Sequence, residues 1–206
     1  MVYGRWTIFY FAASKKDTML SHLTSQLNTM TKEVTGAVQG RLVQVAENRM
    51  VVHAMYENKE AADAAAERAS GVRASMAEFV TEAPIIREGE LVWGVDVEGQ
   101  APGSPTPAAS YMTFRATDID SSKYDSLMAY MDSTKEQFRD LSGLLRLGIG
   151  RIAENRIVAA AIYDSKASSD AAQENAAAVM VGGSEFFTGN VVFLQGDLMW
   201  SGRPNS

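Results

Sequence analysis

The chain has 206 residues, a net charge of −6 and no cysteine, with 46% apolar and 21% charged residues, as in an ordinary globular protein. No basic run exceeds two residues, which argues against nucleic acid and anionic membranes as partners, because both require clustered Lys and Arg. The lack of cysteine excludes disulfides, thiolate metal sites and cysteine nucleophiles.

The beginning of the chain predicts a strand. Residues 1–6 lack the apolar core of a signal peptide. No apolar run approaches the roughly 18 residues that suggest a membrane span. We therefore expect a cytoplasmic protein.

The first two elements are a strand and a long helix. Trp6–Phe11 is β-branched and aromatic, which predicts the strand. Apolar residues then recur at helical spacing from Met19 to Val34, which predicts a helix that begins near Ser14. Gly36 is expected to end this helix in the first position after the C-cap.

A hairpin follows the first helix. Arg41–Val45 and Met50–Tyr56 have strand composition, and a short segment containing Glu47 and Asn48 separates them. Asparagine tolerates positive φ, so this segment predicts a tight antiparallel turn.

The last two elements of the first half are a helix and a strand. Asn58 is a suitable N-cap for a helix through Ala61–Ala69, and Leu91–Trp93 predicts the final strand. The predicted order is strand, helix, strand, strand, helix, strand.

The chain contains an internal duplication. Ala46-Glu47-Asn48-Arg49 returns as Ala153-Glu154-Asn155-Arg156, 107 positions later. Between residues 36 and 93, about a third of the positions are identical at this offset without a gap. Gly143 and Ser165 therefore correspond to Gly36 and Asn58. We interpret the chain as two copies of one domain.

The element order predicts an α+β fold of two tandem ferredoxin-like (βαββαβ) repeats. The expected boundaries are residues 1–97 for the first repeat, 98–108 for a Pro/Gly-rich linker and 109–206 for the second repeat. Such a sheet carries helices on one face only, so its other face must be covered. Two sheets in one chain can cover each other, which predicts an intrachain dimeric α/β-barrel.

One segment resembles a known family. Tyr56-Glu57-Asn58-Lys59-Glu60-Ala61-Ala62-Asp63, with its copy beginning at Tyr163, is similar to the dimeric α/β-barrel superfamily, in particular to antibiotic-biosynthesis-monooxygenase-like domains. The aromatic residue of this family is often Trp, whereas both copies here have Tyr. The resemblance implies a pseudo-dimer within one chain and a small-molecule pocket between sheet and helices.

The resemblance leaves several functions open. Members include cofactor-independent monooxygenases of aromatic polyketides, haem-degrading enzymes and domains of no known activity. The haem-degrading branch uses a Trp near the end of the third strand and a His on the second helix. Here the strand position is Tyr56, and the second helix contains no His. Haem degradation is therefore disfavoured, and no cofactor is expected.

No metal site is expected either. Asp118 and Asp120 resemble a paired-carboxylate or metal motif, but they stand where a helix begins, and helix capping explains them better.

The two histidines are the candidate catalytic residues. His53 lies within a predicted strand, on the face opposite Tyr56, and Ala160 takes its place in the second half. His22 borders the apolar stripe of the first helix. A neutral imidazole at pH 7 could act as a general base. The alternatives are a hydrogen-bonded core histidine for His53 and a solvated boundary residue for His22.

Three tyrosines are candidate ligand-pocket residues: Tyr10, Tyr56 and Tyr163. The resemblance places the last two in the ligand cleft, and a phenol supplies both an apolar ring and a polar group. The alternatives are rim residues that cap the helix layer and, for Tyr10, a core or interface aromatic.

The leading functional hypothesis is a small-molecule-binding barrel that acts as a cofactor-independent, monooxygenase-like oxidoreductase on an aromatic or quinol-type substrate. One alternative is a non-catalytic ligand-binding or stress-associated barrel. Another is an assembly protein that forms homo-oligomers through exposed sheet edges. The expected partner is a small-molecule ligand, without nucleic acid or membrane.

Overall fold

A computed structural model describes residues 1–97, 104–108 and 110–204. The predicted linker, 98–108, lies partly outside the described residues. No helix in the described part of the chain is long and apolar enough to cross a membrane.

The described elements follow the predicted order twice. The strands are β1 (Tyr3–Tyr10), β2 (Ala37–Ala46), β3 (Arg49–Tyr56), β4 (Ile85–Asp96), β5 (Tyr111–Asp118), β6 (Leu144–Ala153), β7 (Arg156–Tyr163) and β8 (Val192–Gly202). The α-helices are α1 (Lys16–Glu33), α2 (Lys59–Ala64), α3 (Ala66–Ser75), α4 (Tyr124–Ser133), α5 (Lys135–Arg139) and α6 (Lys166–Gly182). Short 3₁₀ turns are η1 (Ala13–Lys15), η2 (Ser121–Lys123) and η3 (Ser184–Phe186).

The strands form one closed sheet in the order β1-β3-β2-β8-β5-β7-β6-β4. The paired strands run antiparallel within each half, and the register of β1 against β3 repeats in β5 against β7. The predicted α+β barrel of two ferredoxin-like halves within one chain is confirmed.

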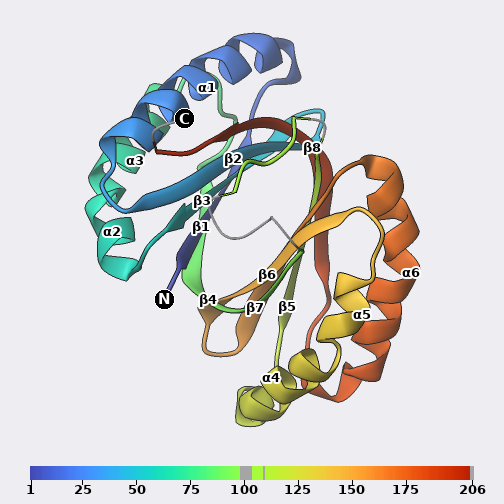
Figure 1. Cartoon of the computed structure of the whole chain (residues 1–206). Helices are drawn as coiled ribbons and strands as arrows, with labels where there is room; N and C mark the ends of the chain where they lie inside the picture. Colours follow the sequence, from blue (N-terminus) through green and yellow to red (C-terminus); the bar gives the residue numbers. More distant parts are fainter. Residues whose placement is uncertain (98–103, 109, 205–206) are drawn as a thin grey trace. The chain divides into compact units, whose positions relative to one another are not determined.

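The first compact unit comprises Met1–Glu90 together with Leu198–Ser206. Helices α1, α2 and α3 cover one face of its strands β1, β2 and β3 (Figure 1). The core between these layers contains Phe9, Leu23 and Val72, and Trp200 packs against it. The end of β8 therefore completes the core of this unit.

The second compact unit comprises Leu91–Asp197. Helices α4, α5 and α6 cover one face of β5, β6 and β7 (Figure 1). Its core contains Leu127, Phe138 and Ile149, together with Trp93 from the end of β4. The first six residues of β4, 85–90, belong to the first unit and the remaining six, 91–96, to the second, and β8 is divided between Asp197 and Leu198.

The hairpin and the helix caps agree with the sequence prediction. Two-residue turns, Glu47–Asn48 and Glu154–Asn155, join the paired strands in both halves. The Asn58 side chain accepts a hydrogen bond from the Ala61 amide at 2.8 Å. Ser165 accepts one from the Ser168 amide at 3.2 Å. These local signals were sufficient because they depend on residues next to one another in the chain.

The prediction that Gly36 directly follows the C-cap of the first helix was wrong. Helix α1 ends at Glu33, and Val34, in extended conformation, is its C-cap. Gly36 lies two residues further on, in the turn before β2, with φ of 77°. Gly143 occupies the equivalent turn with φ of 75°. The glycine is therefore required by the helix-to-strand turn rather than by the helix end.

We expect Gly36→Ala to lower the free energy of unfolding by about 1–3 kcal/mol, because the left-handed conformation is strained for alanine. The added Cβ would also lie 2.6 Å from the Ala61 Cβ. Gly71→Ala is the matched control, since Gly71 lies in α3 with no atom within 4 Å of an added Cβ. That substitution should raise stability by up to about 1 kcal/mol. Urea unfolding measures the stability of both variants. Equal effects of the two substitutions would contradict the assignment of Gly36 to a turn that requires glycine.

Candidate functional site

A pocket lies between sheet and helices in the first unit. Strands β1 and β3 and helices α1 and α3 supply its walls, and its volume is about 50 Å³. The polar residues among those that line it are Arg5, Thr7, Tyr56 and Arg73. The apolar ones are Phe9, Leu23, Leu27, Met30, Val52, Ala54, Ala69 and Val72. We refer to this site as the first-half pocket.

The second unit has a pocket in the corresponding place, here called the second-half pocket. Its volume is about 70 Å³, and Tyr163 and Arg115 are among its polar lining residues. Ala161, Ala176 and Val179 line it at positions 107 after Ala54, Ala69 and Val72 of the first-half pocket. The duplication has therefore preserved an apolar pocket with a tyrosine in each half.

Strand alternation separates the predicted site residues. Tyr56 faces the helices with Ala54, whereas His53 points to the opposite face of β3. There the His53 ring stacks on Trp6, its partner on β1, with ring centroids 5.0 Å apart. His53 is 4% exposed. Tyr56 and His53 are therefore not brought together around one cavity.

His22 lies on α1 and is not among the residues that line the first-half pocket. Its Nε2 is 3.0 Å from the Ser75 hydroxyl oxygen. That hydroxyl donates to the carbonyl of Val72, a pocket residue, at 2.8 Å. Because the Ser75 proton is used there, we assign the Nε2–H of His22 as the donor to Ser75, which leaves Nδ1 as the nitrogen that can accept a proton. His22 is thus linked to the pocket wall through Ser75.

Tyr10 does not line either pocket. It is the last residue of β1, and the β1 residues that line the pocket, Arg5, Thr7 and Phe9, alternate with it. The Arg49 guanidinium lies over its ring, 5.6 Å from the centroid. Of the three tyrosines proposed as ligand residues, the structure places Tyr56 and Tyr163 in pockets and Tyr10 outside them.

The arginines of the pockets were not predicted. Arg5 is 6% exposed on β1 and lines the first-half pocket together with Arg73 of α3. In the second-half pocket, Arg115 donates to the side-chain oxygen of Gln173. The sequence contained one usable signal: Arg5 stands two residues before Thr7 and four before Phe9, so strand periodicity places all three on one face.

The buried tyrosines are held in the neutral form. Burial raises the pKa of Tyr56 above its ordinary value, and the charge of Arg5 opposes this effect. Burial likewise raises the pKa of Tyr163, against the charge of Arg115. A neutral phenol keeps its O–H proton, so both side chains can donate a hydrogen bond to a ligand near neutral pH.

The carboxylate pair that resembled a metal motif has structural roles. Asp120 accepts hydrogen bonds from the Ser122 amide at 3.0 Å and from the Ser122 hydroxyl at 2.6 Å, so it caps η2 as predicted. Asp118 forms an ion pair with Arg156 at 2.7 Å. Across the described ranges, no group of three or more His, Cys, Asp or Glu residues is placed to hold a metal ion.

Comparison with known proteins identifies the fold. No protein-family model and no curated protein sequence matches the chain. A proposed monooxygenase from Fusobacterium nucleatum superposes with a TM-score of 0.78 at 9% identity, over 98% of this chain and 94% of that chain. An anthrone oxidase-like protein superposes with a TM-score of 0.72 at 12% identity, over 100% and 94%.

The same fold also carries haem in another protein. A haem-binding protein from Thermus thermophilus superposes with a TM-score of 0.60 at 11% identity, over 96% of this chain and 92% of that chain. At such low identity these likenesses establish architecture alone. The protein is therefore a dimeric α/β-barrel of the kind seen in monooxygenase-like proteins, with both halves in one chain.

Neither described pocket lining offers a histidine to haem iron. The second half contains no histidine at all. In the first half, neither His22 nor His53 is among the residues that line the pocket. The imidazole that many haem proteins use as an axial ligand is therefore missing from both linings, and the side chains in each that could ligate haem iron are tyrosine and methionine.

Proposed function

We propose that this protein binds a small aromatic or quinol-type molecule between sheet and helices and oxidises it with dioxygen, without a bound cofactor. A CH₂ carbon of the substrate would lose both hydrogens and gain one oxygen atom of O₂ as a carbonyl, and the other oxygen atom would leave as water with those two hydrogens, so that the substrate itself supplies the electrons. The observation that supports the proposal is the apolar pocket with a buried tyrosine, which recurs in both halves. At about 50 and 70 Å³ the two pockets must widen to admit a ring system. The shared fold with an anthrone oxidase-like protein points to the same class of substrate.

A base is required to form the substrate anion that reacts with dioxygen. His53 and His22 are the candidates, since a neutral imidazole is available near pH 7. His22 is the better placed of the two, because its partner Ser75 is bonded to the pocket residue Val72. For its Nδ1 to accept the proton, the side chain would have to leave Ser75 and turn toward the pocket.

A second candidate function is binding without catalysis. It is favoured by the same geometry, because neither histidine is among the residues that line the first-half pocket. In that case the two pockets would hold a hydrophobic ligand, and the tyrosines would orient it. In either case the proposed partner is a small molecule, and we propose neither nucleic acid nor membranes as partners. A further alternative is an assembly protein that forms homo-oligomers, which sedimentation would reveal.

Oxygen uptake with dithranol, a hydroxylated anthrone, distinguishes these functions. The wild-type protein should accelerate uptake above the rate in buffer, and Ala69→Phe, which fills the first-half pocket, should abolish the acceleration. His22→Ala should reduce the rate by about 10²–10⁴-fold, as expected for loss of a general base. His53→Ala is the matched variant for the other candidate base, which lies on the opposite face of the sheet.

Each outcome has a defined meaning. If both histidine variants retain the wild-type rate, the base assignment is refuted. If the wild-type protein binds dithranol without accelerating its oxidation, binding without catalysis is the function. Urea unfolding of every variant separates loss of activity from loss of the fold.

A further inference from the structure

We propose that the ligand of the first-half pocket is a hydrophobic organic anion, whose carboxylate is bound by Arg5, Arg73 and the hydroxyl of Tyr56. The inference deepens the proposed function, on which it rests for the assumption that this pocket binds a small molecule. It follows from three features of the first unit: an incompletely used buried guanidinium, an excess of positive charge and an apolar wall.

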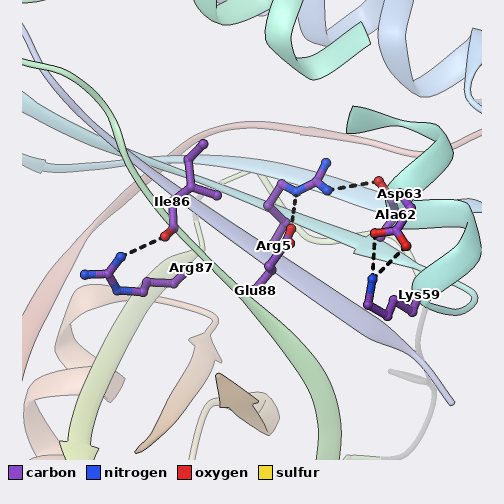
Figure 2. A network of polar contacts seen from close by, with 7 residues as sticks. All are labelled: Arg5, Lys59, Ala62, Asp63, Ile86, Arg87 and Glu88. Carbon is purple, nitrogen blue, oxygen red and sulfur yellow. Dashed lines mark hydrogen bonds and ion pairs between the residues drawn. The ribbon is translucent and has the colours of Figure 1, made fainter. Parts of the chain in front are cut away.

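The guanidinium of Arg5 is only partly used by the protein. Its Nε donates to Glu88 at 2.8 Å, and its Nη2 donates to the backbone carbonyl of Ala62 at 2.9 Å. Its Nη1 is buried and makes no hydrogen bond to any described residue. Figure 2 shows this third nitrogen without a dashed line. A buried donor without a partner is costly, so a ligand acceptor here would be favourable.

The Tyr56 hydroxyl is a second available donor. It is buried, and no described residue meets it with ordinary hydrogen-bond geometry; burial raises its pKa, and a hydrogen-bonding contact with Arg5 nevertheless acts against that larger effect. The Arg5 guanidinium lies over the Tyr56 ring, 5.5 Å from its centroid, so the two groups border the same part of the pocket. The guanidinium can only donate, whereas the neutral phenol can donate its proton and also accept at its oxygen. The Arg5 Nη1 therefore requires an acceptor, and the Tyr56 O–H can donate to the same acceptor.

Charge favours an anionic acceptor over a neutral one. Arg5 and Arg73 contribute two positive charges to the lining, and Glu88, which pairs with Arg5, contributes one negative charge from a side chain 37% exposed. No Asp or Glu is among the residues that line the pocket. Burial, followed by the charge of Arg5, lowers the pKa of Arg73. A carboxylate between the two guanidiniums would relieve this repulsion through charge-assisted hydrogen bonds.

The remaining wall requires a hydrophobic body. Phe9, Leu23, Leu27, Val52 and Val72 line the pocket away from the arginines. These side chains offer no hydrogen bond to a polar ligand, so the part of the ligand that they contact should be apolar. The occupant is therefore an amphipathic molecule with one charged end.

The second-half pocket provides an internal comparison. Met180 stands at the position of Arg73, 107 residues later, and Thr113 stands at the strand position of Arg5. The one arginine of this pocket, Arg115, is already bonded to Gln173. The second-half pocket has therefore lost the pair of guanidiniums, and we infer that it does not select for an anion.

Isothermal titration with 1-naphthoate and 1-naphthamide tests the inference, because these probes have nearly the same shape and differ in charge. Naphthoate should bind the wild-type protein at least about tenfold more tightly than naphthamide, as expected for a charge-assisted hydrogen bond. Arg73→Gln should weaken naphthoate binding much more than naphthamide binding, and so remove most of this preference. Arg73 is chosen because loss of Arg5 would also remove the bond to Ala62.

Two further variants locate the effect. Arg68→Gln is the matched control, since Arg68 is on the same helix but pairs with Glu33 at the surface and does not line the pocket. It should change neither affinity. Ala69→Phe fills the first-half pocket and should abolish the preference for naphthoate. Ala176→Phe, in the second-half pocket, should leave this preference unchanged.

The outcomes separate the inference from the proposed function. If both probes bind with equal affinity and Ala69→Phe blocks both, the pocket binds small molecules and the anion inference is overturned. If Arg73→Gln leaves the naphthoate preference unchanged, the assignment of its guanidinium is likewise overturned. Failure of both probes to bind the folded wild-type protein would overturn the anion inference and the proposed pocket together.

Discussion

Residues 1–97, expressed without the rest of the chain, should fail to form a stable monomer. The first compact unit includes Leu198–Ser206, which this fragment lacks, so Trp200 would no longer pack against its core. The fragment would also expose Trp93 and Val95, which are 9% and 0% exposed in the intact chain. Exposing each such side chain costs about 1.5–3 kcal/mol, which is a large part of the stability of a small domain.

Circular dichroism, urea unfolding and analytical ultracentrifugation measure this effect. The fragment should be largely unfolded or should self-associate, because a second copy could supply the missing strand end. Addition of residues 104–206 in trans should restore cooperative unfolding. A fragment that remains monomeric and unfolds with the stability of the intact protein would show that the exchanged strand ends contribute little.

Trp93→Ala should destabilise the protein strongly. Its indole is 9% exposed, meets the Phe138 ring edge-on at 6.0 Å and donates a hydrogen bond to Asp132 at 2.9 Å. Truncating a buried aromatic side chain of this size costs about 3–5 kcal/mol. The free energy of unfolding in urea is the measurement.

Trp200→Ala is the matched comparison, because Trp200 is the duplicate of Trp93. Its indole is only half-buried and donates to the exposed Asn28 at 2.9 Å. The smaller apolar area and the solvated partner predict a loss of about 1–2 kcal/mol. Equal losses for the two variants would contradict the difference in burial on which the prediction depends.

The local elements could be predicted because their causes are local. The Glu47–Asn48 turn, the Asn58 cap and the Asp120 cap each depend on residues within a few positions. The helix-to-strand turn at Gly36 was misplaced, because a glycine after an amphipathic stripe predicts positive φ but does not say where the last helical hydrogen bond falls. The final strands contain the predicted segments and begin earlier, at Ile85 in β4 and at Val192 in β8.

The site was less predictable than the fold. Tyr56 and Tyr163 were proposed through the family resemblance, and the structure places both in pockets. The two histidines were chosen for their chemistry, and the structure places His53 on the other sheet face and His22 behind Ser75. Arg5 and Arg73 line the same pocket although they are 68 positions apart in the chain, and no pattern within either segment predicts this.

The sequence by itself determined that this protein is a duplicated α+β chain with two similar halves, because a repeated order of strands and helices is written in the periodicity of side chains along the backbone. The tertiary structure alone decided which side chains meet around each pocket. Burial of a charge depends on what surrounds it in space, and Arg5, Arg73 and Tyr56 come from three elements that only folding brings together.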